Sequence, residues 1–138
     1  MNKINYINLP ENYIRENHID LHWTNISIYS NLSDNFIREF NNKLDWFELS
    51  KRNLSEDIIR EFQDNVYWRF VRKLHPRSES FIIEFQDKMD WDEISFKQKL
   101  SNEFIIENIT KLNINYLLLN ARIIDPDIRE YLMLLSGN

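Results

Sequence analysis

A glutamate that recurs along the whole chain is the first group whose spacing suggests chemistry. Its positions, 22 or 23 residues apart, are Glu16, Glu39, Glu61, Glu84, Glu107 and Glu130. A row of carboxylates can bind cations, and a carboxylate can act as a general acid or base. Catalysis needs one carboxylate whose surroundings differ from those of the others, whereas these six have nearly the same neighbours. We therefore expect each glutamate to accept hydrogen bonds from the adjacent repeat or to cap a helix, and we predict no catalytic residue.

The segment HIDLH is the other candidate for chemistry, because His18 and His22 are four residues apart, a spacing that helical metal sites use. The two histidines flank an expected break between helices and no third ligand is evident, so we predict no metal site. With three histidines, one glycine and no cysteine, the chain has little material for a catalytic triad, a phosphate-binding loop or thiolate chemistry. We expect a protein that is not an enzyme and that holds no cofactor.

The recurring glutamate belongs to a longer repeat. LSDNFIREFNNKLDW, residues 32–46, is followed by LSEDIIREFQDNVYW, residues 54–68. Tryptophans keep the same register at Trp23, Trp46, Trp68 and Trp91, and Ile114 takes the next position. A fixed period in the twenties is typical of stacked repeats, in which each unit buries its apolar side against its neighbours.

Each repeat reads as two short helices. Ser33 precedes an apolar stripe at Phe36, Ile37, Phe40 and Leu44 and is placed to cap the first helix. Ser55, Ser78, Ser101 and Asp125 occupy the same position. Asp45, Asp90 and Asn113 precede the tryptophan position and mark the start of the second helix. We expect the tryptophans and the apolar residues three positions later to form core.

The predicted fold is all-α, an α-solenoid-like stack of about five and a half two-helix repeats in one domain over residues 1–138. The repeats lie near 9–31, 32–53, 54–76, 77–99 and 100–122, and a C-terminal cap covers 123–138.

The pattern L-S-x-x-F-I-x-E-F…D-W resembles a short helical repeat found in proteins of large DNA viruses, phages and some bacteria. The resemblance covers roughly residues 9–131. It implies an α-solenoid and a viral or phage origin, and it implies no activity, because such repeats are defined by their packing positions. The chain departs from the pattern at His22, Tyr67, Arg77 and Ile114.

The composition limits the partners. The net charge of −5 argues against general affinity for nucleic acid, which needs a clustered positive surface. The chain begins without the apolar run of a secretory signal and has no stretch of about 18 apolar residues. We expect a cytoplasmic protein, in the host cytoplasm if it is viral, that binds protein rather than nucleic acid or membrane.

Two adjacent repeats differ from the others at positions expected to face solvent. The residue before the recurring glutamate is Arg15, Arg38, Arg60 or Arg129 in four repeats and Ile83 or Ile106 in two. In those same two repeats, Phe96 and Leu119 stand where two earlier repeats have lysine. Apolar side chains gathered on a solvated surface indicate a partner-binding site, and coverage by the segment YLMLLSGN is the alternative.

The segment WRFVRKLHPR concentrates positive charge, with Arg69, Arg72 and Lys73 on one side of a helix and Arg77 after it. Four charges are fewer than the roughly 6–10 phosphate contacts of strong nucleic-acid binding. Arg69, Arg72 and Lys73 are therefore predicted to dock an acidic surface of a partner protein, with an ordinary solvated face as the alternative.

The leading functional prediction is a non-enzymatic protein–protein interaction module of viral or phage origin. One alternative is an anti-CRISPR-like phage inhibitor that covers the basic nucleic-acid channel of a host defence nuclease. Binding of that kind would weaken strongly with added salt. Another is a virion or assembly component whose C-terminal segment mediates self-association.

Overall fold

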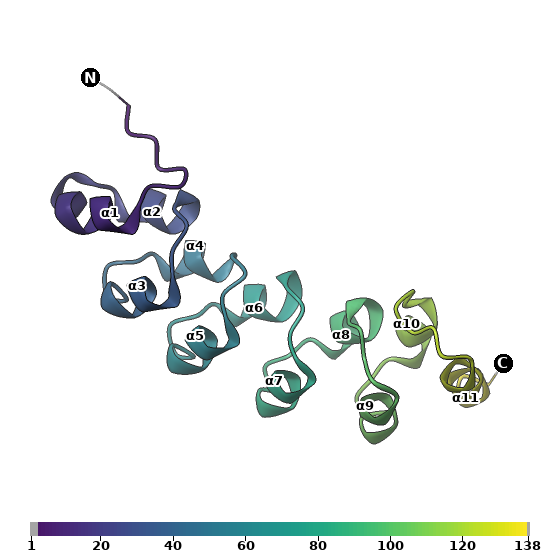
Figure 1. Cartoon of the computed structure of the whole chain (residues 1–138). Helices are drawn as coiled ribbons and strands as arrows, with labels where there is room; N and C mark the ends of the chain where they lie inside the picture. Colours follow the sequence, from purple (N-terminus) through teal and green to yellow (C-terminus); the bar gives the residue numbers. More distant parts are fainter. Residues whose placement is uncertain (1–2, 138) are drawn as a thin grey trace. The chain divides into compact units, whose positions relative to one another are not determined.

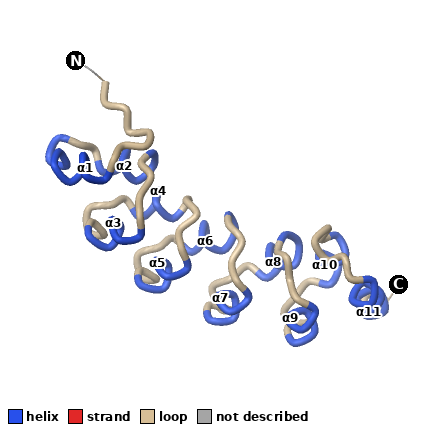
Figure 2. The backbone as a smooth tube through the Cα atoms, in the orientation of Figure 1, coloured by secondary structure: helices blue, strands red, loops and turns tan. Residues whose placement is uncertain are grey.

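The computed structural model describes residues 3–137, and within that range it contains eleven α-helices, one 3-10 helix and no strand (Figure 1, Figure 2). The prediction of an all-α repeat fold is confirmed. None of the helices in this range has the length and apolar character needed to cross a bilayer.

Each repeat contributes two helices, as the sequence predicted. The first is α1 (Glu11–Asn17), α3 (Asp34–Glu39), α5 (Glu56–Glu61), α7 (Glu79–Glu84) or α9 (Asn102–Glu107). The second is α2 (Trp23–Tyr29), α4 (Trp46–Ser50), α6 (Trp68–Leu74), α8 (Trp91–Lys97) or α10 (Ile114–Leu119). A 3-10 helix, η1 (His18–Asp20), lies between α1 and α2, and α11 (Pro126–Leu135) follows α10. Helices this short are unstable alone, so their stability depends on packing.

The chain divides into two compact units, unit 1 (Met1–Val71) and unit 2 (Arg72–Asn138), with the boundary inside α6. In unit 1, α1, α3 and α5 form one row, and α2 packs against α4 in another (Figure 1). In unit 2, α7 and α9 form one row, while α10 packs against both α8 and α11 (Figure 1). The prediction of one domain over the whole chain stays a prediction.

The predicted helix starts are confirmed. Each capping serine accepts a hydrogen bond from the amide three residues later, at 3.1–3.2 Å, and these serines are Ser33, Ser55, Ser78 and Ser101. Asp125 caps α11, where Pro126 occupies the first turn and loses no hydrogen bond. The caps therefore mark the 22–23-residue register through contacts within each repeat.

The same caps also join neighbouring repeats. The amide of Ser33 donates to Glu11 Oε1 at 2.6 Å, and the amide of Ser101 donates to Glu79 Oε1 at 2.6 Å. At the last junction the direction of the hydrogen bond is reversed. The capping residue, Asp125, accepts it, and Asn102 Nδ2 of the preceding repeat donates at 3.0 Å. This hydrogen bond is the main reason that the pKa of Asp125 lies below its usual range, and the amides of Ile128 and Asp127 add to the effect.

A buried serine in the second helix makes another junction. Ser27, Ser50 and Ser95 are almost fully buried, and each hydroxyl donates to the carbonyl of the tryptophan one turn earlier, at 2.5–2.8 Å. The same hydroxyl accepts the amide at the start of the next second helix, at 2.9 Å. Each serine thus provides a hydrogen-bond acceptor for a part-buried amide of the next repeat.

The tryptophans only partly match the prediction that they form core. The residues three positions later, Leu49, Val71 and Ile94, are fully buried, whereas all four tryptophan side chains are half-buried. The indoles instead pack against aromatic rings of the neighbouring repeat. Trp23 lies 5.2 Å from the Phe40 ring centroid and Trp46 lies 5.0 Å from that of Phe62, both in the following repeat. At this depth the indole N–H can still reach a hydrogen-bond partner. In Trp46, Trp68 and Trp91 it donates to the backbone carbonyl of the residue five positions earlier.

The C-terminal helix α11 packs on α10 and closes that end of unit 2. Arg129, which occupies the arginine position before the recurring glutamate, donates to the carbonyls of Leu118 at 2.9 Å and Ile123 at 3.1 Å. The side chains of Met133, Leu134 and Leu135 are 48%, 72% and 45% exposed. Self-association through this segment stays a prediction.

Candidate functional site

The four apolar residues predicted to bind a partner are all exposed. Ile83 on α7 and Ile106 on α9 are 39% and 52% exposed, and Phe96 on α8 and Leu119 on α10 are 44% and 66% exposed. The C-terminal helix therefore leaves them open to solvent. They belong to two rows, however, with the isoleucines on the α7–α9 row and the other two on the α8–α10 row (Figure 1).

The arginines that Ile83 and Ile106 replace form a ladder in unit 1. Arg15 Nε lies 3.0 Å from Glu39 Oε2, and Arg38 Nη2 lies 2.7 Å from Glu61 Oε1. Each arginine thus binds the recurring glutamate of the next repeat. For Glu39 and Glu61 this confirms the prediction that the recurring glutamate accepts hydrogen bonds from an adjacent repeat.

The contact between Arg38 and Glu61 shifts the pKa of both residues. The hydrogen bond from Arg38 lowers the pKa of Glu61, and the same contact raises the pKa of Arg38 above its usual range. A lowered carboxyl pKa stabilises the fold above the pKa of the unfolded chain, and the stabilisation is lost as the pH falls through the folded pKa.

Replacing Arg38 with alanine should therefore raise the pKa of Glu61 towards its ordinary value, because the hydrogen bond that lowers it is lost. The loss in melting temperature should be present at neutral pH and disappear in acid, where Glu61 is protonated in both proteins. Carboxyl-detected NMR titration and thermal melts at several pH values measure both effects. Lys43→Ala is the control, because Lys43 is exposed and has no ion pair within residues 3–137. An unchanged Glu61 titration in the Arg38→Ala protein would show that the ladder contact does not form in solution.

In unit 2, two of the positions equivalent to the ladder arginines hold isoleucine. By repeat register, Ile83 takes the arginine position that serves Glu107, and Ile106 takes the position that serves Glu130. Both glutamates are exposed, and neither has an ion pair with any residue between 3 and 137. We call Ile83, Ile106, Glu107 and Glu130 the Ile–Glu face.

The three basic residues that were predicted to dock a partner lie in two different environments. Arg69 lies over the rings of Phe70 and Phe47, with its guanidinium carbon 4.7 and 5.3 Å from their centroids. Arg72 and Lys73, at the end of the same helix, line a cavity of unit 2 instead. The helical spacing that suggested one shared side thus missed the cation–π contacts of Arg69.

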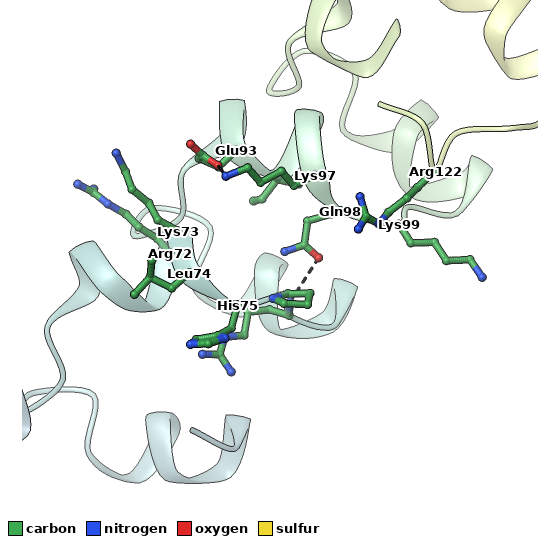
Figure 3. Close-up of a pocket in the computed structure, with 12 residues that line it drawn as sticks. Arg72, Lys73, Leu74, His75, Glu93, Lys97, Gln98, Lys99 and Arg122 are labelled. Atoms are coloured by element: carbon green, nitrogen blue, oxygen red, sulfur yellow. Dashed lines mark hydrogen bonds and ion pairs between the residues drawn. The ribbon is translucent and has the colours of Figure 1, made fainter. Parts of the chain in front are cut away.

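The cavity has a volume of about 470 Å³ and lies beside α8, at the ends of the second helices and the segments that follow them (Figure 3). Its basic lining residues are Arg72, Lys73, Arg77, Lys97, Lys99 and Arg122. Glu93 is the only acidic residue that lines it among those the structure describes. In Figure 3, Arg122 points toward Gln98, while Arg72, Lys73 and Lys99 extend outward around the cavity.

Some of these cations have carboxylate partners and some do not. Lys97 Nζ lies 2.8 Å from Glu93 Oε2, and Lys73 Nζ lies 3.8 Å from Asp90 Oδ2. Arg72, Lys99 and Arg122 are exposed and form no ion pair within the described part of the chain. Arg72, Lys99 and Arg122 therefore bring positive charge to the cavity that no carboxylate among residues 3–137 neutralises.

Three basic segments at equivalent repeat positions indicate this cavity in the sequence. KLHPR (residues 73–77), KQK (97–99) and AR (121–122) lie at equivalent places along the chain, at the end of the second helix or just after it. Stacking brings equivalent segments together, so their charges add. Lys97, Lys99 and Arg122 were not predicted, because the charge of WRFVRKLHPR was considered without that of the equivalent segments in the next two repeats.

The two histidines of the segment HIDLH make contacts within the fold. His18 Nδ1 lies 2.9 Å from the carbonyl of Arg15, and the imidazole packs 6.0–6.1 Å from the rings of Phe40 and Trp23. His22 precedes α2 and its amide donates to the Tyr6 hydroxyl at 3.1 Å. Nowhere between residues 3 and 137 do three or more histidine, aspartate or glutamate side chains gather as metal ligands would.

Comparison of the chain with protein-family models, with curated proteins and with solved structures finds no match.

Proposed function

We propose that this protein is a non-enzymatic interaction module that docks another protein on the Ile–Glu face of unit 2. The supporting observation is that isoleucine takes the place of the ladder arginines in unit 2. In unit 1, Arg15 and Arg38 neutralise the glutamate of the next repeat. In unit 2 the same positions hold exposed Ile83 and Ile106, so the carboxylates of Glu107 and Glu130 remain without cations from the described chain.

The chemistry of this face indicates the kind of partner. A partner segment with apolar side chains would bury Ile83 and Ile106, and each buried branched side chain contributes roughly 1.5–3 kcal/mol when it leaves water completely. Arginine or lysine on the same segment would take the place of the missing ladder arginines beside Glu107 and Glu130. Charge complementarity of this kind raises the association rate and selects among partners. The expected partner surface is therefore amphipathic and basic.

Affinity capture from lysate with the tagged protein tests the proposal. The wild-type protein should recover a partner that is lost when Ile83→Glu and Ile106→Glu are combined, because two added carboxylates remove the apolar contact and repel other acids. The paired substitutions Ile83→Arg and Ile106→Arg should also lose the partner. They restore the residue type of unit 1, so the fold should tolerate them.

The matched control combines Ile7→Glu with Ile19→Glu, two unit 1 isoleucines that are 62% and 89% exposed. This control adds the same charge elsewhere and should keep the partner, as quantified by mass spectrometry. Equal recovery of every captured protein by the wild type and both unit 2 variants would exclude the Ile–Glu face as the docking site.

A further inference from the structure

The basic cavity of unit 2 concentrates most of that unit's positive charge. Six of the nine lysine and arginine residues between Arg72 and Asn138 line it, although the unit has more acidic than basic residues. Solvated cations need no common cavity, and scattering them among the acids would lower their mutual repulsion. This segregation indicates an anionic ligand.

Arg77 provides a second, independent observation. It occupies the repeat position that Leu54 and Leu100 fill, and it is as buried as they are, with 8% of its surface exposed. Its guanidinium carbon lies 5.8 Å from the centroid of the Phe81 ring. A leucine at this position would pack without burying a charged group, so the arginine departs from the packing pattern of the other repeats. Residues that depart from the pattern of the fold are typical of functional sites.

The residue types specify the anion further. Three of the four arginines of unit 2, Arg72, Arg77 and Arg122, line the cavity. The planar guanidinium fork binds the oxygens of a phosphate in pairs, and a phosphate ester carries more charge in a small volume than a carboxylate. A volume of about 470 Å³ lies within the usual range of about 300–1,000 Å³ for small-ligand sites.

We propose that this cavity binds phosphoryl groups, supplied either by a phosphorylated side chain of another protein or by a small phosphate compound. Arg77 and Arg122 hold the phosphoryl oxygens inside the cavity. Arg72 and Lys99, at the rim, complete the neutralisation by rotating their long side chains. Extended nucleic acid is disfavoured, because phenylalanine, tyrosine and tryptophan are absent from the described lining and the rest of the unit is acidic.

Isothermal titration of the full chain with four probes tests this proposal: pyrophosphate, a phosphoserine hexapeptide, the same hexapeptide with glutamate for phosphoserine, and a single-stranded 20-nucleotide DNA. At least one of the first two probes should bind. Preference for the peptide assigns the phosphoryl group to a protein, and preference for pyrophosphate assigns it to a small compound. Binding should weaken as salt is added.

Two variants connect the binding to the cavity. The triple substitution Arg72→Gln, Lys99→Gln and Arg122→Gln should lower the affinity for the phosphate probe at least about tenfold, because charge-assisted hydrogen bonds are lost. The three side chains are exposed, so the fold should tolerate the change. Arg77→Leu should also lose affinity while keeping or raising the melting temperature, because it restores the leucine of the other repeats. The control, Lys3→Gln with Lys43→Gln and Lys88→Gln, removes the same charge outside the cavity and should change affinity less than about twofold.

The proposal fails if neither phosphate probe binds. It also fails if the DNA or the glutamate peptide binds more tightly than both, or if the triple variant binds as the wild type does. The Ile–Glu face is unchanged in every one of these variants, so this result and the docking result can be separated.

Discussion

Replacing Phe81 with alanine should lower the free energy of unfolding by about 3–5 kcal/mol, the largest effect that we expect from one substitution. Phe81 is fully buried at the first turn of α7. Its ring centroid lies 4.8 Å from that of Phe85. The substitution removes the transfer free energy of the ring and leaves a void that short helices joined by caps fill poorly. Denaturant unfolding followed by circular dichroism measures the loss.

Phe96→Ala is the matched control, since Phe96 belongs to the same unit but its side chain is 44% exposed. We expect a change of about 0.5 kcal/mol or less there, as for most surface positions. Similar losses for the two variants would contradict the placement of Phe81 in the core.

Replacing Asn120 with alanine should cost about 1–3 kcal/mol, because it leaves buried carbonyls without donors. Asn120 is 1% exposed. Its amide nitrogen donates to the carbonyls of Ser95 at 2.9 Å and Gln98 at 2.8 Å, and its side-chain oxygen accepts the Arg122 amide at 3.0 Å. In unit 1, Arg52 donates to the carbonyl of Ser27 at 3.1 Å from the equivalent position. A donor at this position therefore closes the end of the preceding second helix in both units.

Asn120→Asp distinguishes the hydrogen bonds from the volume of the side chain. It keeps the size and the acceptor for Arg122 but removes both donors and places a carboxylate against two carbonyls. At neutral pH it should destabilise the protein more than alanine does. Asn115→Ala, at an exposed position of α10, serves as the control for loss of an asparagine. Thermal melts of the three variants should rank them with Asn115→Ala the most stable and Asn120→Asp the least, and any other order would contradict this role.

Much of the fold could be predicted from the sequence, because the patterns that specify it act over short stretches of chain. A capping serine, an apolar stripe and an aspartate before tryptophan each act within a few residues, and Ser33 and Asp45 cap α3 and α4 as predicted. The burial of tryptophan was overestimated. Periodicity locates an apolar face but not the depth of a side chain within it, and the indole N–H of Trp46 requires a position near the carbonyl of Asn41.

The candidate sites were less predictable, because they depend on which repeats meet. Ile83 and Ile106 were identified by comparing copies, and their exposure agrees with that expectation. Repeat register pairs Glu107 and Glu130 with these isoleucines, and the Arg38–Glu61 contact shows what an arginine does at that position. Arg122 and Lys99, which no single segment connects with Arg72, line one cavity only after stacking.

The sequence by itself determined the two-helix repeat, its register and the start of each helix that a side chain caps, because capping and apolar periodicity are short-range effects within one repeat. Tertiary structure decided which exposed cations are neutralised and which face a cavity. Those properties depend on distances between side chains about one repeat apart, and only the packing of neighbouring helices sets such distances.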